Sequence, residues 1–460
     1  MKRYFFFLIF MPFAGFSQSD IVKRCIPLIA AQQFVEADAF IDSVLLKHPK
    51  EPDAWMMKGN SILNRHLLSL KSEPIIANPD EDILSIEANG LNSPPQVPEK
   101  KVIDSVEQYW KKTLAADSAR EDVYMGLCTV YGMSMQTDKL LACLPVLKKI
   151  SRKGSELGYL MEDYARLLRE RGKVADANKV FAAISTMYPK ESGIWSDWAG
   201  EYLLNADLKS AVEKADKALQ CRTIDEPTRE NLVDIYLYAQ QPEKAVKTIE
   251  LYQKSDTTYT YAPLYRALSG FSVGDTVWKK RMIALVAEKQ YQNDTNEIVQ
   301  VCKFLASSVY TGKNHDITMA MLSAPLNNFC SWAVIHRAKN DFPDSANVQL
   351  IAAEFYLNGK NYAVANSIFK KAETLKMDSV NRSDMHMVYA YSAYRAGDTP
   401  TATALFNTIV ADENLFKRQA AFYFLGKMSL PNTFLLKKLV AEKQKTKYFY
   451  LGQLLLNNVK

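Results

Sequence analysis

The chain has 460 residues, of which 48% are hydrophobic and 23% are charged, and its formal net charge is +6 at pH 7. This composition excludes an intrinsically disordered chain, and the length suits either two or three ordinary domains or one extended repeat array. Much of the positive charge is local, because residues 431–460 hold six lysines and one acidic residue. A nucleic-acid-binding protein is therefore not expected.

The first residues have the pattern of a secretory signal peptide. Lys2 and Arg3 precede an apolar run over 4–13, and Gly15 and Ser17 place small residues at the −3 and −1 positions of a cleavage site. The run is too short to span a bilayer of about 30 Å. We therefore expect a signal peptide over 1–17 and export to a periplasm, with outer-membrane association left open. No cysteine follows the cleavage site to carry a lipid anchor, and no later stretch reaches transmembrane length.

Helical hairpins in register at 34 residues dominate the segment 158–259, with units that start at Gly158, Ser192 and Glu226. Small residues at positions 8 and 20 of each unit allow two helices to approach closely, and large residues at positions 4, 11 and 24 fill the remaining space. Position 20, for example, is alanine in all three units. Further units start at Gln18, Pro52, Glu121, Ala346 and Ser383.

Three regions depart from this register. An acidic, proline-rich loop over 72–99 is inserted between the two helices of the Pro52 unit, and it either packs on the protein itself or binds a partner. Beyond 259 the helical segments 261–271, 276–290, 297–310, 315–323 and 326–340 follow the repeat weakly. Segments 416–427 and 433–447 supply closing helices, which a repeat array needs at its end.

The repeats resemble the tetratricopeptide repeat (TPR) in a degenerate form, and Gly172 and Pro189 match the turn and end of its unit. The resemblance implies an all-α, right-handed α-solenoid with a degenerate middle section and C-terminal closing helices. The expected parts are a signal peptide at 1–17, an N-terminal array at 18–259, degenerate hairpins at 260–345, two hairpins at 346–416, and closing helices with a basic tail at 417–460. The signal is similar to those of exported Bacteroidetes proteins.

In the family, positions 2, 5, 9 and 12 of each first helix line a concave groove. Chaperone-binding members hold a peptide carboxylate with lysine at 5 and asparagine at 9, but position 5 has no lysine here and position 9 has one asparagine. Methionine and tyrosine in the groove would suit an adaptable apolar or helical peptide. The residues expected to bind a partner are Met56, Asn60, Met125, Glu162, Arg166, Arg169, Asp234, Tyr391 and Tyr394, although packing against neighbouring helices would equally explain them.

No catalytic, nucleotide-binding or metal-binding motif occurs, and the five histidines have no ligand-like spacing. We therefore expect a non-catalytic scaffold or adaptor without cofactor or metal, which binds a protein or peptide. The alternative is a TPR-based glycan or peptide capture protein at the outer membrane, and an enzyme with an unfamiliar helical site is a third reading.

Six cysteines occur without a C-x-x-C pair. Cys25 and Cys128 occupy the small-residue position 8, where a buried free thiol is expected, and a bridge between Cys128 and Cys143 within one hairpin stays open. The basic tail, with the apolar segment 448–451, could contact an acidic partner or a membrane surface, or could simply be a solvated closing helix.

Overall fold

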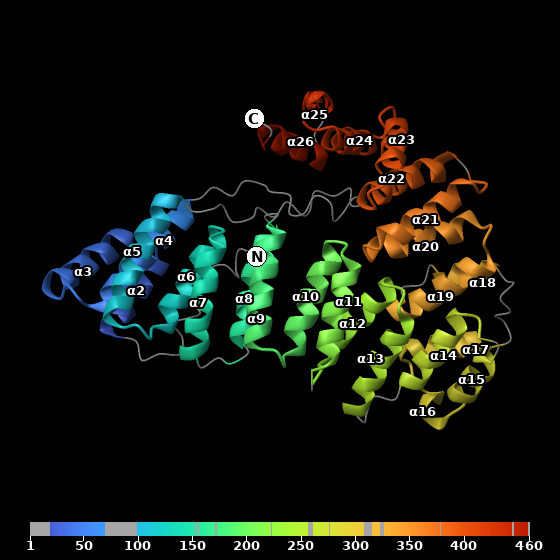
Figure 1. Cartoon of the computed structure of the whole chain (residues 1–460), viewed down its shortest axis with the longest axis horizontal. Helices are drawn as coiled ribbons and strands as arrows, with labels where there is room; N and C mark the ends of the chain where they lie inside the picture. Colours follow the sequence, from blue (N-terminus) through green and yellow to red (C-terminus); the bar gives the residue numbers. More distant parts are fainter. Residues whose placement is uncertain are drawn as a thin grey trace. The chain divides into compact units, whose positions relative to one another are not determined.

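The computed structural model describes residues 19–69, 99–151, 154, 156–170, 173–221, 223–255, 261–275, 277–307, 315–322, 326–377, 379–443 and 446–458. Over these residues every regular element is a helix and no strand occurs, so the expected all-α class is confirmed (Figure 1). The chain divides into two compact units, with the boundary between Pro189 and Lys190.

The first unit contains four helical hairpins. Their helices are α2 (Asp20–Ala30), α3 (Phe34–Lys47), α4 (Pro52–Ser69), α5 (Lys100–Ala116), α6 (Glu121–Met133), α7 (Thr137–Ile150), α8 (Glu156–Glu170) and α9 (Val174–Met187). Each helix packs on its hairpin partner. Contacts also link each hairpin to the following one, since α2 packs on α4, α6 packs on α8, and α7 packs on α9. Helices α4 and α5 pack on each other, and the insertion expected between them at 72–99 stays a prediction.

The second unit begins with regular hairpins and then becomes irregular, as the sequence predicts. It contains α10 (Ser192–Leu204), α11 (Leu208–Leu219), α12 (Glu226–Tyr238), α13 (Pro242–Ser255), α14 (Ala262–Ser272), α15 (Trp278–Val286), α16 (Lys289–Gln292), α17 (Glu297–Ala306), α18 (His315–Leu322) and α19 (Asn328–Asp341). In the irregular part α19 packs on both α14 and α12. The chain therefore brings a late helix back against an early one.

Regular hairpins return in the last part of the second unit. Its helices are α20 (Ala346–Asn358), α21 (Tyr362–Glu373), α22 (Ser379–Arg395), α23 (Thr399–Ile409), α24 (Leu415–Met428), α25 (Phe434–Val440) and α26 (Lys447–Asn458). The pairs α20–α21 and α22–α23 begin at or near the predicted starts, and α24, α25 and α26 pack on one another as a closing group.

The same backbone turn joins the two helices of most hairpins, at position 15 of the repeat. Gln32, Met135, Ala206, Gln240, Lys360 and Gly397 all have positive φ there. The next residue donates its N–H to a carbonyl five residues back, as Asp207 does to Tyr202 at 3.0 Å. This is the C-terminal cap of a Schellman motif, in which a left-handed residue ends the helix. The recurrence of this turn confirms the 34-residue register independently of the side chains.

The small repeat positions are buried between helices. Ala199, Ala211 and Ala245 are fully buried, as are Cys25 and Cys128. Large neighbours such as Phe181 and Tyr236 are equally inaccessible. The predicted close helix pairing, with small residues at the contacts, is thus confirmed.

The predicted closing helix over 433–447 is wrong in its extent. Helix α25 ends at Val440, and α26 starts only at Lys447. Between them the side chain of Gln419 on α24 accepts hydrogen bonds from the backbone N–H and the hydroxyl of Thr446, at 3.2 and 2.7 Å. Gln419 Nε2 also donates to Glu442 at 3.0 Å, so one buried side chain of α24 holds residues at both ends of the linker.

Some predictions lie outside the described residues. These are the signal peptide at 1–17, Gly172, and the acidic loop at 72–99 apart from Glu99. The backbone N–H of Glu99 donates to His66 Nε2 at 3.1 Å, which holds the start of α5 beside the end of α4.

Candidate functional site

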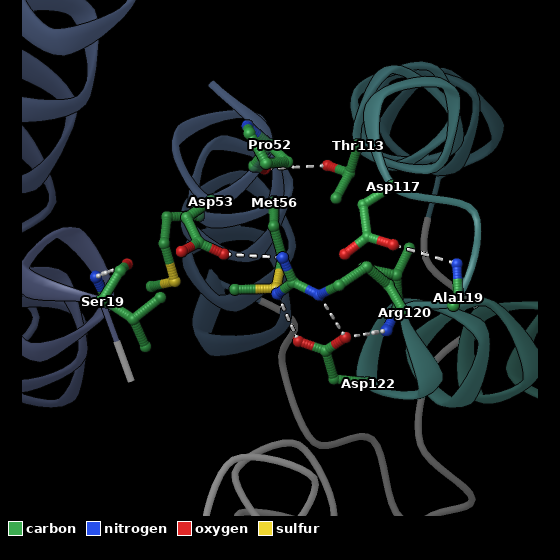
Figure 2. A network of polar contacts seen from close by, with 12 residues as sticks. Ser19, Pro52, Asp53, Met56, Thr113, Asp117, Ala119, Arg120 and Asp122 are labelled. Carbon is green, nitrogen blue, oxygen red and sulfur yellow. Dashed lines mark hydrogen bonds and ion pairs between the residues drawn. The ribbon is translucent and has the colours of Figure 1, made fainter. Parts of the chain in front are cut away.

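Arg120 joins two hairpins of the first unit (Figure 2). Its guanidinium donates one hydrogen bond to Asp53 on α4 at 2.7 Å and two to Asp122 on α6 at 2.9 and 2.6 Å. The side chains of both aspartates are largely buried, at 16% and 9% exposed. A planar guanidinium that serves two carboxylates fixes the approach of α6 to α4.

Met56 belongs to the same contact network and is only 2% exposed. Its sulfur lies 3.0 Å from Arg120 Nη2, and its carbonyl accepts the indole N–H of Trp110 at 3.1 Å. Asn60 and Met125, the other expected partner-binding residues on α4 and α6, are also buried, at 7% each. The structure therefore gives these three side chains packing roles within the unit, and their contact with a partner stays a prediction.

Three predicted residues share one face of α8, at positions 5, 9 and 12 of its repeat. Glu162 is buried at 2% exposed, whereas the Arg166 side chain is 42% exposed and lies 3.6 Å from the Glu162 carboxylate. Arg169, one turn further along, is half-buried. Of the predicted residues in the first unit, Arg166 is thus the side chain best placed for contact with another molecule.

Asp234 occupies position 9 in the second unit, where α12 meets α19. Its carboxylate accepts a hydrogen bond from Asn328 at 2.7 Å. Burial raises the pKa of this carboxyl to about 6, and the negative charge of Glu230 acts in the same direction. Sequence periodicity placed Asp234 on the inner face of α12 but gave no sign of Asn328, because the two residues are 94 positions apart.

The predicted tyrosines on α22 differ in exposure. Tyr391 is buried, accepts a hydrogen bond from Arg395 at 2.8 Å, and packs edge-on against Tyr362. Tyr394 is half-buried against Phe424 of α24. Tyr391 thus has a packing role, while part of Tyr394 is open to solvent.

Two arrangements have the residue types of hydrolytic sites, but their geometry argues against catalysis. Lys417 lies 3.0 Å from the hydroxyl of Ser383, yet its ammonium is paired with Asp384 at 2.5 Å. The Lys417 ammonium therefore joins α24 to α22 through an ion pair and is not directed at the hydroxyl alone. His315 contacts Ser345 at 2.9 Å, but the neighbouring Asp316 is fully exposed and cannot hold the imidazole in place.

A polar cluster that sequence reasoning missed lies between α5, α6 and α7. Glu107 on α5 is 7% exposed, forms an ion pair with Lys111 at 2.6 Å and accepts a hydrogen bond from Lys139 at 2.7 Å. Burial, and after it the negative charge of Glu107, raises the pKa of Tyr131. Only the Glu107–Lys111 spacing of four residues was visible in the sequence. Across the part of the chain that the structure describes, no group of three or more His, Cys, Asp or Glu side chains is arranged to hold a metal.

The apolar residues of the basic tail face inward. Tyr448, Phe449 and Leu451 are at most 5% exposed, and Tyr448 packs against Phe416, Tyr423 and Phe424. These three side chains pack within the end of the second unit, as a closing helix would, and contact of the basic tail with an acidic partner or a membrane surface stays a prediction. None of the described helices has both the length and the apolar character needed to cross a membrane.

No protein-family model matches the chain, and no curated protein matches it. Among solved structures, the TPR domain of P58(IPK) is 11% identical, with a TM-score of 0.21 over 83% of this chain and 99% of the other. A monomeric mutant of IFIT1 with Gppp-AAAA is also 11% identical, with a TM-score of 0.21 over 98% of this chain and 83% of the other. The function proposed below rests on the helical pairs and side chains of this chain alone.

Proposed function

We propose that the protein is a non-catalytic scaffold, exported to the periplasm, that binds a protein or peptide partner along the first helices of its repeats. The observation that carries this proposal is the repeated hairpin itself. Position 9 of the repeat is Arg166 on α8, in the first compact unit, and Asp234 on α12, in the second. Each compact unit thus has a polar side chain on the same face of the first helix of a hairpin. Repeat arrays bind partners along such faces.

The chemistry of these faces favours a polar or charged partner surface over a purely apolar one. Met56, Met125 and Tyr391 are occupied in packing, whereas Arg166 and Tyr394 retain exposed surface. Arginine and tyrosine are enriched among the residues that dominate binding energy. We therefore place the partner contacts on Arg166, Arg169 and Tyr394 rather than on the methionines.

Affinity capture from native cell envelopes with the full-length mature protein, followed by mass spectrometry, tests the proposal. Its second step measures binding of the purified partner to Arg166→Glu and Tyr394→Ala. The matched control is Lys179→Glu, because Lys179 is an exposed lysine on the second helix α9. We expect at least a tenfold loss for the first two variants and none for the control.

Three results would contradict the proposal. They are equal binding by all variants, recovery of oligosaccharide without any protein, and export of a reporter failing when it is fused to residues 1–17. The second result would support the capture protein instead, and the third would remove the periplasmic location while leaving the scaffold role intact.

A further inference from the structure

Helix α3 in the first hairpin has an exposed apolar stripe. Val35 and Leu46 are 78% and 85% exposed, the two highest values among the large apolar side chains that the structure describes. They lie about three turns apart on one side of the helix, and the exposed residues Ala39 and Ser43 lie between them on the same side. Aligned apolar side chains, unlike a single exposed one, are typical of an interaction surface.

The other sides of α3 face its neighbours in the unit. Phe40 faces α2, where Arg24 lies 4.2 Å from the centre of its ring, and Asp42 forms an ion pair with Lys58 on α4 at 2.7 Å. Figure 1 shows α3 at the outer end of the first unit. The described helices of this unit therefore leave the stripe uncovered.

Two opposite charges border the stripe on one flank. Glu36 lies in the first turn of α3 and Lys47 in the last, and both are exposed. Only about 20° separates them around the helix axis, so they share the flank nearest α2. Within the part of the chain that the structure describes, neither charged group has an ion-pair partner. The flank is thus negative at one end and positive at the other.

A second copy of α3 complements this pattern. When two copies lie antiparallel about a two-fold axis, Val35 of one packs against Leu46 of the other, and Glu36 of one meets Lys47 of the other. Each contact occurs twice, because an interface of this symmetry uses the same surface on both copies. Residues on the same flank face each other in an antiparallel helix pair, whereas a parallel pair would keep the two charges at opposite ends.

We propose that the protein self-associates through α3, as an antiparallel two-fold dimer joined by the apolar stripe and by two ion pairs between Glu36 and Lys47. One helix of 14 residues offers less area than the roughly 800 Å² per partner of a standard complex, so the dimer is weak and depends on concentration. The dimer does not depend on the scaffold function, because Arg166 and Tyr394 lie on other helices.

Sedimentation velocity of the full-length mature protein, over about 1 to 300 µM, measures the association. We expect the parent to shift from monomer to dimer over this range, and Leu46→Glu to weaken the dimer by at least about tenfold, because a buried leucine contact is lost. Phe434→Glu is the matched control, since Phe434 is another large apolar side chain, 68% exposed on α25. It should dimerise as the parent does.

Charge reversal tests the antiparallel arrangement. Glu36→Lys and Lys47→Glu each place like charges opposite each other and should weaken the dimer by about threefold to tenfold, with a smaller effect at high salt. The double variant Glu36→Lys/Lys47→Glu restores opposite charges and should recover the affinity of the parent. Circular dichroism checks the fold of each variant, because both charges also complement the dipole of α3.

Four outcomes would overturn the proposal. A parent that stays monomeric over the whole range would show that α3 does not bind a second copy. Unchanged dimerisation of folded Leu46→Glu would move the contact to another surface, and an equal loss in Phe434→Glu would attribute the effect to added charge in general. A double variant as weak as the two single variants would contradict the antiparallel arrangement.

Discussion

The indole of Trp110 on α5 donates a hydrogen bond of 3.1 Å to the backbone carbonyl of Met56 on α4. The ring is 3% exposed and passes between two glycines, Gly59 on α4 and Gly126 on α6. A Cβ added to Gly59 would collide with the indole, and one added to Gly126 would lie 2.8 Å from it. Three helices thus pack around one side chain because two of them have no side chain at the contact.

We predict that Gly126→Ala destabilises the protein by about 1–3 kcal/mol, because the buried indole has to move and this outweighs the better helix propensity of alanine. Urea unfolding of the full chain measures the change. Gly200→Ala is the matched control, since its new Cβ would find its nearest neighbour, Asn231, at an ordinary 3.6 Å. The control should be stabilised by up to about 1 kcal/mol, and a stabilised Gly126→Ala would refute the packing account.

Ala206 holds the left-handed turn between α10 and α11, with φ of 62°. A residue with a Cβ is strained there by about 1–2 kcal/mol, and glycine is not. We predict that Ala206→Gly raises the free energy of unfolding by about 1 kcal/mol, although glycine usually weakens a helix. The comparison is Ala182→Gly, at an exposed site inside α9. This change should lower the free energy of unfolding by a similar amount. Destabilisation at both positions would show that the turn is not strained.

Removal of Arg120 leaves the carboxylates of Asp53 and Asp122 without their shared partner. We predict that Arg120→Ala costs about 3 kcal/mol in unfolding free energy, because both carboxylates are largely buried. Arg120→Lys should recover only part of this loss, since an ammonium cannot match the two-carboxylate geometry. Lys179→Ala, which removes an exposed ion pair with Asp176, should leave the unfolding curve unchanged. Full rescue by lysine would show that charge alone matters.

The half-buried Asp234 carboxyl predicts a specific pH dependence. Burial raises its pKa from 3.8 to about 6, so the folded state holds a proton that the unfolded state releases between these values. Stability contributed by this group is therefore present below pH 4 and is lost as the pH rises to 6. Asp234→Asn cannot ionise, and it should be more stable than the parent at pH 7 by up to about 3 kcal/mol, with no difference at pH 4.

Unfolding curves of the parent and of Asp234→Asn at several pH values measure this difference. Glu230→Gln is the control, because the Glu230 side chain is 68% exposed and burial is the larger cause of the raised Asp234 pKa, so most of the pH dependence should stay in place. A stability difference for Asp234→Asn that does not change with pH would contradict the assignment.

Much of the fold could be predicted because the repeat pattern depends on residues that are close together in the sequence. A 34-residue spacing of alanine, glycine and cysteine specifies where two neighbouring helices touch, and the helices at 121, 192, 226 and 346 begin where the spacing places them. The irregular middle could not be assigned in the same way. There α19 returns to pack on α12, and no short-range pattern records a contact between helices that far apart.

The candidate binding face was predicted only in part. Repeat positions correctly grouped Glu162, Arg166 and Arg169 on one helical face, but position alone could not distinguish the exposed Arg166 from the buried Met56. That difference depends on Trp110 and Arg120, which reach Met56 from other helices. The sequence left open whether the tail closes the array or contacts a partner, because the aromatic partners of Tyr448 lie on α24.

The amino-acid sequence by itself determined the helical class, the hairpin register and the sites of close helix contact, because each follows from side-chain size at a fixed spacing along one segment. Only the tertiary structure decided which polar and aromatic side chains stay accessible and that Asp234 meets Asn328. Exposure and proximity depend on every helix that surrounds a residue, and those helices come from parts of the chain whose separation carries no local signal.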